Sequence, residues 1–234
     1  MRNKLLIHTL LLSSVVLLGA NAYAGVVVGG TRVVYDGSKR ETSLSVKNPD
    51  TIPYLIQAWA DSAGPTGENK GAAKPPFIIT PPLFRLDAGK ENMVRIVRAG
   101  GDLPADRESV FWMNTKSIPA SKHSDKNVLQ ISIKTRIKLF YRPAGLKAPT
   151  VDDYQKVSFS RAGAKLDVTN PTPYYLSFSS LKAGSTDIDT TNVMVPPKGH
   201  AEYSLPGSVN GNNITWQVIN DFGGPSKAVT SIIK

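Results

Sequence analysis

The chain has 234 residues and a formal net charge of +10, from 28 Lys and Arg against 18 Asp and Glu. It contains no cysteine, which excludes a disulfide framework, thiolate metal ligands and a cysteine nucleophile together. A basic chain can bind nucleic acid, anionic lipid or an acidic partner. Its densest basic group, Lys134, Arg136, Lys138 and Arg142, alternates with Ile and Leu, which indicates a strand with one polar face. We therefore predict a solvated basic surface and no nucleic-acid partner.

The N-terminus has the pattern of a secretion signal. Arg2 and Lys4 form a short basic region, Leu5–Leu18 is mainly apolar, and Ala22-Tyr23-Ala24 has the small-x-small pattern that signal peptidase cleaves. The apolar run is shorter than the roughly 20 residues that a membrane-spanning helix needs. The sequence therefore predicts a signal peptide over residues 1–24 and an exported mature protein that is not inserted in a membrane.

Short alternating segments separated by turn residues fill the first half of the mature chain. In the first of them, apolar and polar side chains alternate, which is typical of a half-buried strand. The predicted strands in this half are Glu41–Asn48, Tyr54–Ala60, Asn92–Arg98 and Ser109–Ser117. The stretch Asp61–Pro76 is rich in Gly, Pro, Ala and Lys without an apolar period, so we predict a long mobile loop and assign it no role.

The most informative segment is Val128–Tyr141, which alternates along its whole length. Leu129, Ile131 and Ile133 share one face, and at about 3.3 Å per residue the strand would be roughly 46 Å long, more than a strand usually needs. The pattern alone favours ordinary core residues. The alternative is an exposed apolar edge, which proteins normally avoid and would keep only to pair with another chain.

The second half also consists of short segments separated by turn residues, so we predict an all-β fold for the whole mature chain. Its predicted strands are Lys156–Ser160, Lys165–Asn170, Tyr174–Leu181 and Ile214–Asn220, with prolines and glycines between them. The Pro143-Ala144-Gly145 turn after the long strand is the natural boundary. We predict two antiparallel sandwiches, over residues 25–144 and 145–234.

Several longer motifs carry a family resemblance that covers essentially the whole mature chain. The chain resembles the periplasmic pilus-assembly chaperones of the chaperone–usher pathway, of the PapD type. The matching stretches are Thr31–Tyr35, Ile79–Leu86, Leu103–Asn114, Arg136–Pro143, Asn170–Leu176, Met194–Gly199 and Ile219–Gly223. The resemblance implies two immunoglobulin-like domains set at an angle with a cleft between them, located in the periplasm, with no enzymatic activity and no cofactor.

The resemblance also implies partners and a binding mode. Members of this family bind pilin subunits and adhesins by donor-strand complementation and deliver them to an outer-membrane usher, a form of strand addition. By position, Arg32 and Lys138 match the two cations that grip the C-terminal carboxylate of a pilin. Leu129, Ile131 and Ile133 match the donor residues that fill the groove of a pilin lacking its last strand.

Three further residues match a structural feature of the family. Glu108, Arg142 and Asp221 match its salt-bridge network between the domains.

The loop before the long strand, roughly Ala120–Asn127, is short and has no flanking cysteines, which resembles the short-loop branch of the family. The sequence leaves open whether the free protein forms a homodimer that covers its exposed edge.

Two other classes of function fit less well. An enzyme would need a positioned base, but the mature chain has only His123 and His200, both in polar segments, and Asp152-Asp153 lies beside a proline in a predicted loop. No metal-ligand spacing or phosphate-binding loop occurs. A pilin or adhesin subunit would be one incomplete sandwich, often with a disulfide, whereas this chain predicts two complete domains without cysteine.

Overall fold

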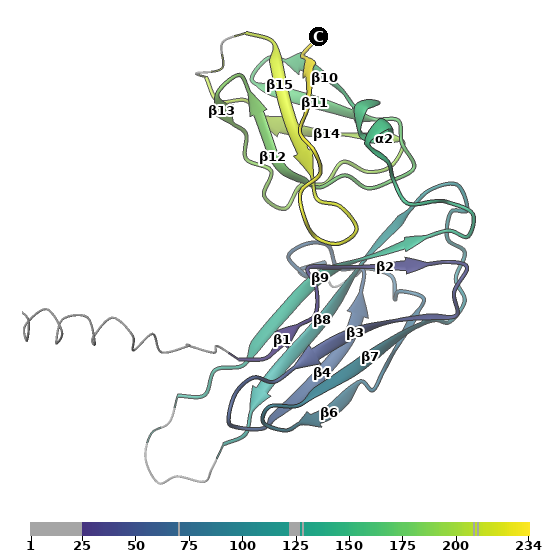
Figure 1. Cartoon of the computed structure of the whole chain (residues 1–234), viewed down its shortest axis with the longest axis vertical. Helices are drawn as coiled ribbons and strands as arrows, with labels where there is room; N and C mark the ends of the chain where they lie inside the picture. The colour runs from purple at the N-terminus through teal and green to yellow at the C-terminus, as the bar shows by residue number, and fades with distance from the viewer. Residues whose placement is uncertain (1–24, 70, 122–126, 128, 208, 210) are drawn as a thin grey trace, which may run out of the picture.

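The chain folds into two β-sandwiches that meet at an angle, with the first domain below and the second above in Figure 1. The computed structural model describes residues 25–69, 71–121, 127, 129–207, 209 and 211–234. The predicted signal peptide and the predicted strand residue Val128 lie outside the described residues. Two separate clusters of buried apolar side chains form the two cores, one in each sandwich.

The first domain packs a four-stranded sheet against a five-stranded one. Their strand orders are β1-β3-β7-β5 and β2-β9-β8-β4-β6. The strands are β1 (Val27–Val28), β2 (Arg32–Asp36), β3 (Glu41–Lys47), β4 (Tyr54–Asp61), β5 (Phe77–Thr80), β6 (Leu83–Leu86), β7 (Glu91–Arg98), β8 (Ser109–Pro119) and β9 (Ile133–Arg142). The four strands predicted in the first half are β3, β4, β7 and β8, each within two residues of its predicted ends.

Between β1 and β2 the chain crosses from one sheet to the other. β1 pairs with β3, whereas β2 pairs with β9, and this second pair is parallel. Glycine fits this crossing closely, because a Cβ on Gly29 would lie 2.1 Å from the Ser45 hydroxyl oxygen and would displace that side chain. The prediction of purely antiparallel sheets is therefore wrong at this one pair. The crossing has a functional consequence, because it places the start of β2 directly beside β9.

The second domain has a three-stranded sheet, β10-β11-β14, and a four-stranded sheet, β13-β12-β15-β16. Its strands are β10 (Ser158–Ala162), β11 (Lys165–Asn170), β12 (Phe178–Ala183), β13 (Thr186–Asp187), β14 (Gly199–Ser204), β15 (Asn213–Val218) and β16 (Val229–Ile232). A short helix, α2 (Val151–Gln155), precedes them. Asp152-Asp153 lies in its first turn and not in a loop as predicted, because Thr150 caps the helix and Tyr154 buries into the core.

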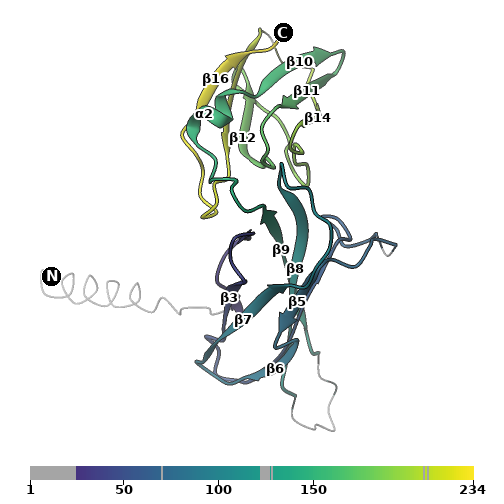
Figure 2. The ribbon, with the colours of Figure 1, turned by 90° about the vertical axis from the view of Figure 1, so that its right-hand side faces the viewer.

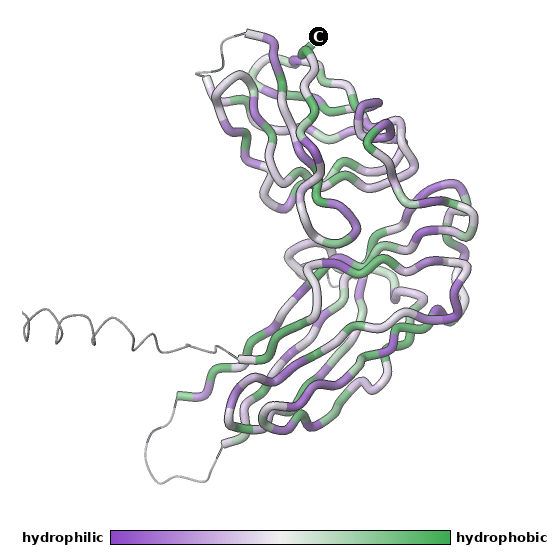
Figure 3. The backbone as a smooth tube through the Cα atoms, viewed as in Figure 1, coloured by the Kyte–Doolittle hydropathy of each residue, from purple (hydrophilic) through white to green (hydrophobic). Residues whose placement is uncertain are grey.

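The long predicted strand is shorter than expected. β9 begins at Ile133, and Leu129–Ser132 are described without strand structure. The ladder between β8 and β9 ends at Ser117 opposite Ile133, although β8 itself continues beside β4 to Pro119, so the chain joins this ladder only at Ile133. Figure 3 shows apolar and polar residues alternating along the strands of this domain, and Figure 2 shows β9 and β8 running up to the second domain. No helix in the described part of the chain is long and apolar enough to cross a membrane.

Candidate functional site

The two halves of β9 have different neighbours. From Lys138 to Tyr141 the strand lies between β8 and β2. From Ile133 to Ile137 it pairs with β8 alone, because β2 begins at Arg32, opposite Lys138. Its other side carries no strand among the described residues. The first half of β9 is therefore a sheet edge whose backbone N–H and C=O groups are available to an added strand.

The apolar side chains that precede and begin β9 are exposed. Leu129 is 86% exposed, Ile131 64% and Ile133 48%. Further along the same face, Ile137 and Leu139 are buried in the core of the first domain. The interpretation of all three as core residues, which the alternating pattern alone favoured, is therefore wrong. The face they share leaves the core before it reaches them, and they form an apolar edge in solvent.

The other end of this edge carries two cations side by side. Arg32 and Lys138 are register partners across the parallel β2–β9 pair. Both line a cleft of about 400 Å³ between the two domains, whose far wall includes Ser177 and Ile219. The Arg32 guanidinium donates a hydrogen bond to the Ile219 carbonyl (2.9 Å), and the Lys138 ammonium donates one to the Ser177 hydroxyl (2.8 Å). Each of the two therefore contacts the second domain through a neutral group.

The electrostatics of this pair favour an anion. Burial lowers the pKa of Lys138 to about 8, and repulsion from Arg32 adds to that shift. Burial also lowers the pKa of Arg32, against the attraction of Asp221. The buried Nε of Arg32 has no hydrogen-bond partner, and neither cation has a carboxylate within 4.0 Å among the described residues. Two partly desolvated cations without an acid between them have the charge and the hydrogen-bond donors that a carboxylate requires.

An ion-pair network joins the two domains behind the cleft. Arg142, at the end of β9, contacts Glu108 at 2.8 Å and Asp221 of the second domain at 2.7 Å. Glu108 also accepts a hydrogen bond from the backbone N–H of Tyr175 (2.8 Å), so it too reaches across the junction. Burial raises the pKa of Glu108, although the charge of Arg142 opposes the shift. The structure thus brings together all three residues that the sequence grouped.

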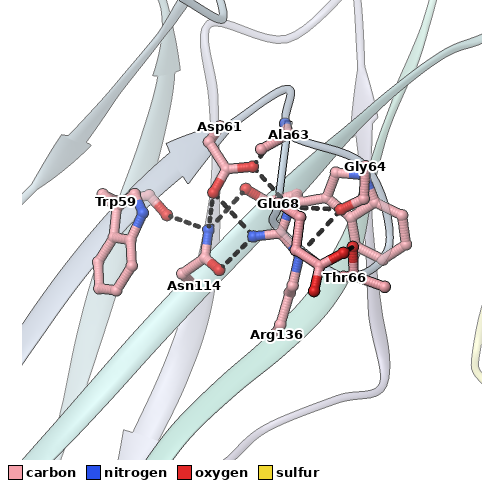
Figure 4. Close-up of polar contacts among 9 residues, drawn as sticks. Trp59, Asp61, Ala63, Gly64, Thr66, Glu68, Asn114 and Arg136 are labelled. Carbon is pink, nitrogen blue, oxygen red and sulfur yellow. Dashed lines mark hydrogen bonds and ion pairs between the residues drawn. The ribbon is translucent and has the colours of Figure 1, made fainter. Parts of the chain in front are cut away.

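Sequence reasoning missed the residues that surround these cations. Ser177 is a plain serine before a strand, and Ile219 contributes only its backbone oxygen, so neither carries a signal in the sequence. Asp61 is also missed, since the loop that it begins was assigned no role. It forms an ion pair with Arg136 at 2.6 Å. Figure 4 shows this pair together with Asn114.

No group of three or more His, Asp or Glu side chains in the described residues is arranged to hold a metal ion. Of the two histidines of the mature chain, His200 is exposed on β14, and His123 lies outside the described residues. The charged groups that line the cleft include the cations Arg32 and Lys138, which are also hydrogen-bond donors.

Comparisons with known proteins identify the family. The family described as "Pili and flagellar-assembly chaperone, PapD N-terminal domain" matches residues 25–147. "Pili assembly chaperone PapD, C-terminal domain" matches residues 152–230. The chain is 47% identical over 213 residues to the chaperone protein LpfB of Salmonella typhimurium, which covers 88% of this chain and 89% of LpfB. It is 40% identical over 233 residues to the chaperone protein FimC of Escherichia coli, covering 98% of this chain and 93% of FimC.

Solved structures agree with this assignment. The SafB chaperone, solved in complex with the SafA pilin of Salmonella enterica, matches with a TM-score of 0.80 and 35% identity, covering 92% of this chain and 99% of that one. The periplasmic chaperone SfaE matches with a TM-score of 0.74 and 40% identity, covering 89% of this chain and 100% of that one. The chain belongs to the PapD family of periplasmic pilus-assembly chaperones, which are binding proteins and not enzymes.

Proposed function

We propose that this chaperone holds a pilin subunit by lending it the free half of β9, with the C-terminal carboxylate of the pilin anchored between Arg32 and Lys138. The observation that carries the proposal is the juxtaposition of three features. An unpaired strand edge over Ile133–Ile137 follows a row of exposed apolar side chains, and at its inner end Lys138 lies beside Arg32 of β2, with no carboxylate on either cation among the described residues. An added strand that ends in a carboxylate satisfies all three.

The energies are sufficient for stable binding. Burying Leu129, Ile131 and Ile133 in the groove of an incomplete pilin contributes roughly 5–9 kcal/mol before ordering costs. Each backbone hydrogen bond of the added ladder contributes about 0.5–1.5 kcal/mol net. The pilin carboxylate supplies the negative charge that is missing beside Arg32 and Lys138, and its position fixes where the added strand ends. No ATP is required, and a strand with better complementarity can displace the chaperone.

The angle between the domains is part of the proposed site. The network of Glu108, Arg142 and Asp221 holds the two domains so that Arg32 on β2 and its partner Ile219 in the second domain stay in contact. We assign this network a structural role and no direct contact with the pilin. Its net contribution to stability is smaller than its attraction, because desolvation opposes it.

The proposal extends to partners and branch. The solved relative SafB binds a pilin, and we infer the same class of partner here, including the adhesin subunit of a pilus, with delivery to an outer-membrane usher. The loop over residues 120–127 lies mostly outside the described residues, and its shortness and lack of cysteine favour the short-loop branch. We place the boundary between the domains at residues 144 and 145. In the free protein, the exposed edge favours a homodimer that covers it.

Co-expression with pilin subunits tests the function. Arg32→Ala and Lys138→Ala should each abolish recovery of a pilin on a tagged chaperone while circular dichroism stays unchanged. Ile131→Asp should weaken the complex strongly, whereas Lys134→Asp, on the opposite face of the same strand, serves as the matched control and should not. Undiminished complex with the double variant of Arg32 and Lys138 would show that the carboxylate is not anchored there.

A further inference from the structure

The apolar pattern of the donor segment does not by itself define one register for an added strand. Leu129, Ile131 and Ile133 repeat every two residues, so a slip of two residues still presents two of the three aliphatic side chains to the groove. Such a slip moves the partner by about 6.6 Å along β9. It keeps every side chain on the same face, unlike a slip of one residue. The apolar face therefore separates these registers by a single side chain, and the charges at the inner end of the strand can add to the selection.

The charges on the opposite face repeat with the same spacing. Lys134, Arg136 and Lys138 are successive residues on one face of β9. A carboxylate attracted to Arg136 in place of Lys138 would lie two residues away, which is the slip that the apolar pattern permits. Selection of one register therefore requires that Arg136 be kept from binding an incoming carboxylate.

The side chain of Arg136 has no hydrogen-bond donor left to offer. A guanidinium has five N–H groups, and here each finds an acceptor (Figure 4). Two go to the two carboxylate oxygens of Asp61 (2.6 and 2.7 Å) and one to the side-chain oxygen of Asn114 (2.6 Å). The remaining two go to the carbonyl oxygen of Gly64 (2.5 and 3.1 Å). The bidentate ion pair with Asp61 also neutralises its charge.

The guanidinium is also packed against neighbouring residues. It lies over the ring of Trp112, with its central carbon 5.0 Å from the ring centroid. Gly67, with φ of +77°, lies close to it as well, since a Cβ there would lie 3.4 Å from that carbon. The Arg136 side chain is 9% exposed. Burial alone would raise the pKa of Asp61, but its hydrogen bonds, first that from Arg136, lower the pKa, so the carboxylate stays charged.

Arg32 and Lys138 differ from Arg136 in this respect. Lys138 donates a hydrogen bond to one neutral hydroxyl, and the buried Nε of Arg32 has no partner. We propose that Asp61 is the register-determining residue of the donor strand: by occupying Arg136 completely, it leaves Arg32 and Lys138 as the cleft cations that can take the pilin carboxylate. The inference rests on the proposed carboxylate anchor and assigns a role to the start of the β4–β5 loop.

Disulfide trapping can measure the register directly, because the chain has no cysteine of its own. Ser132→Cys places one thiol in the donor segment. Single cysteines are then scanned along the last strand of the pilin that is recovered with the wild-type chaperone. A disulfide requires Cβ atoms about 3.5–4.5 Å apart, so a shift of about 6.6 Å changes which pilin position is trapped.

The wild-type chaperone should trap one pilin position. Asp61→Asn keeps the shape of the side chain but frees Arg136, and a second position two residues away should then carry at least about a tenth of the trapped complex. Asp61→Ser, which admits water beside the guanidinium, provides the same test if the first variant folds poorly. The double variant Asp61→Asn with Arg136→Gln removes the competing cation as well, and it should return to one position.

The outcomes separate the register role from the alternatives. A single wild-type position in both Asp61 variants would overturn the register role and leave the carboxylate anchor intact. An equal loss of trapped complex in the single and double variants, with no second position, would mean that the pair only holds the loop, and would also overturn the proposal. Wild-type trapping when Arg32 and Lys138 are both changed to Ala would instead refute the anchor itself.

Discussion

Lys138→Met should reveal the energetic cost of holding a cation ready in the cleft. The pKa of Lys138 is lowered from its ordinary value of 10.5 to about 8, because burial disfavours the charged form and Arg32 repels it. One pKa unit corresponds to about 1.36 kcal/mol, so the full shift has an upper bound of about 3.4 kcal/mol. The cleft is open to solvent and the side chain is only half-buried, so we discount this to about 1–2 kcal/mol.

The sign of the effect follows from proton linkage. Between pH 8 and pH 10.5 the unfolded chain still holds the Lys138 proton while the folded chain has released it. The free energy of unfolding of the wild type must therefore rise with pH in this window. Lys138→Met lacks this contribution but also loses the hydrogen bond to Ser177, which contributes about 0.5–1.5 kcal/mol. At pH 7 the free energy of unfolding of the variant should therefore lie between about 0.5 kcal/mol below and about 1.5 kcal/mol above that of the wild type, while the proposed anchor predicts that the variant no longer binds pilin.

Urea unfolding of both proteins at pH 7 and pH 10 measures the difference, with other titrating groups cancelling between them. Between pH 7 and pH 10, the free energy of unfolding of the wild type should rise by about 1–2 kcal/mol relative to that of the variant. Lys134→Met removes an exposed lysine from the same strand and should stay within about 0.5 kcal/mol of wild type at both. If the difference in the free energy of unfolding between the wild type and Lys138→Met does not change with pH, the conclusion that Lys138 is desolvated is refuted.

Two further outcomes follow from the same geometry. Pilin affinity, measured by titration calorimetry, should be constant below pH 8 and should fall by up to about tenfold per pH unit above it. The reason is that above pH 8 the carboxylate must bind together with a proton on Lys138. An affinity that does not change up to pH 10 would contradict this. Arg142→Met leaves Glu108 buried without its cation and should destabilise the chain by about 3–5 kcal/mol in thermal and urea unfolding. Adding Glu108→Gln should recover part of that loss, and equal stability of the single and double variants would argue against a buried ion pair.

Much of the architecture could be predicted from the chain alone. Period-two alternation bounded by prolines and glycines located β3, β4, β7, β8 and β11 closely, because successive side chains of a half-buried strand face the core and the solvent in turn. The short elements β1, β5, β6, β13, β16 and α2 were missed, because they contain too few residues to show a period. The longer strands β2 and β14 were missed as well. The parallel pairing of β2 with β9 could not be found, because no local pattern tells which sheet a strand joins.

The site divides in the same way. The alternation singled out the apolar row at Leu129, Ile131 and Ile133, whereas only the family resemblance, and no local pattern, singled out Arg32 and Lys138. It could not determine that the apolar row lies in solvent, because alternation is the same for a strand that continues into the core and one that runs past it. Exposure depends on which residues join the sheet: the ladder with β8 begins only at Ile133, and β2 begins only opposite Lys138.

Asp61 and Arg136 show the limit most clearly. They are 75 positions apart in the chain, and each alone resembles an ordinary surface charge. Only the folded structure brings the start of the β4–β5 loop over β9 and saturates one cation while leaving its neighbour Lys138 free of a carboxylate. Local sequence fixes the chemistry that each side chain can offer. Which of those chemistries remain available is decided by long-range contacts, since a hydrogen bond or a charge that is already satisfied cannot serve a partner.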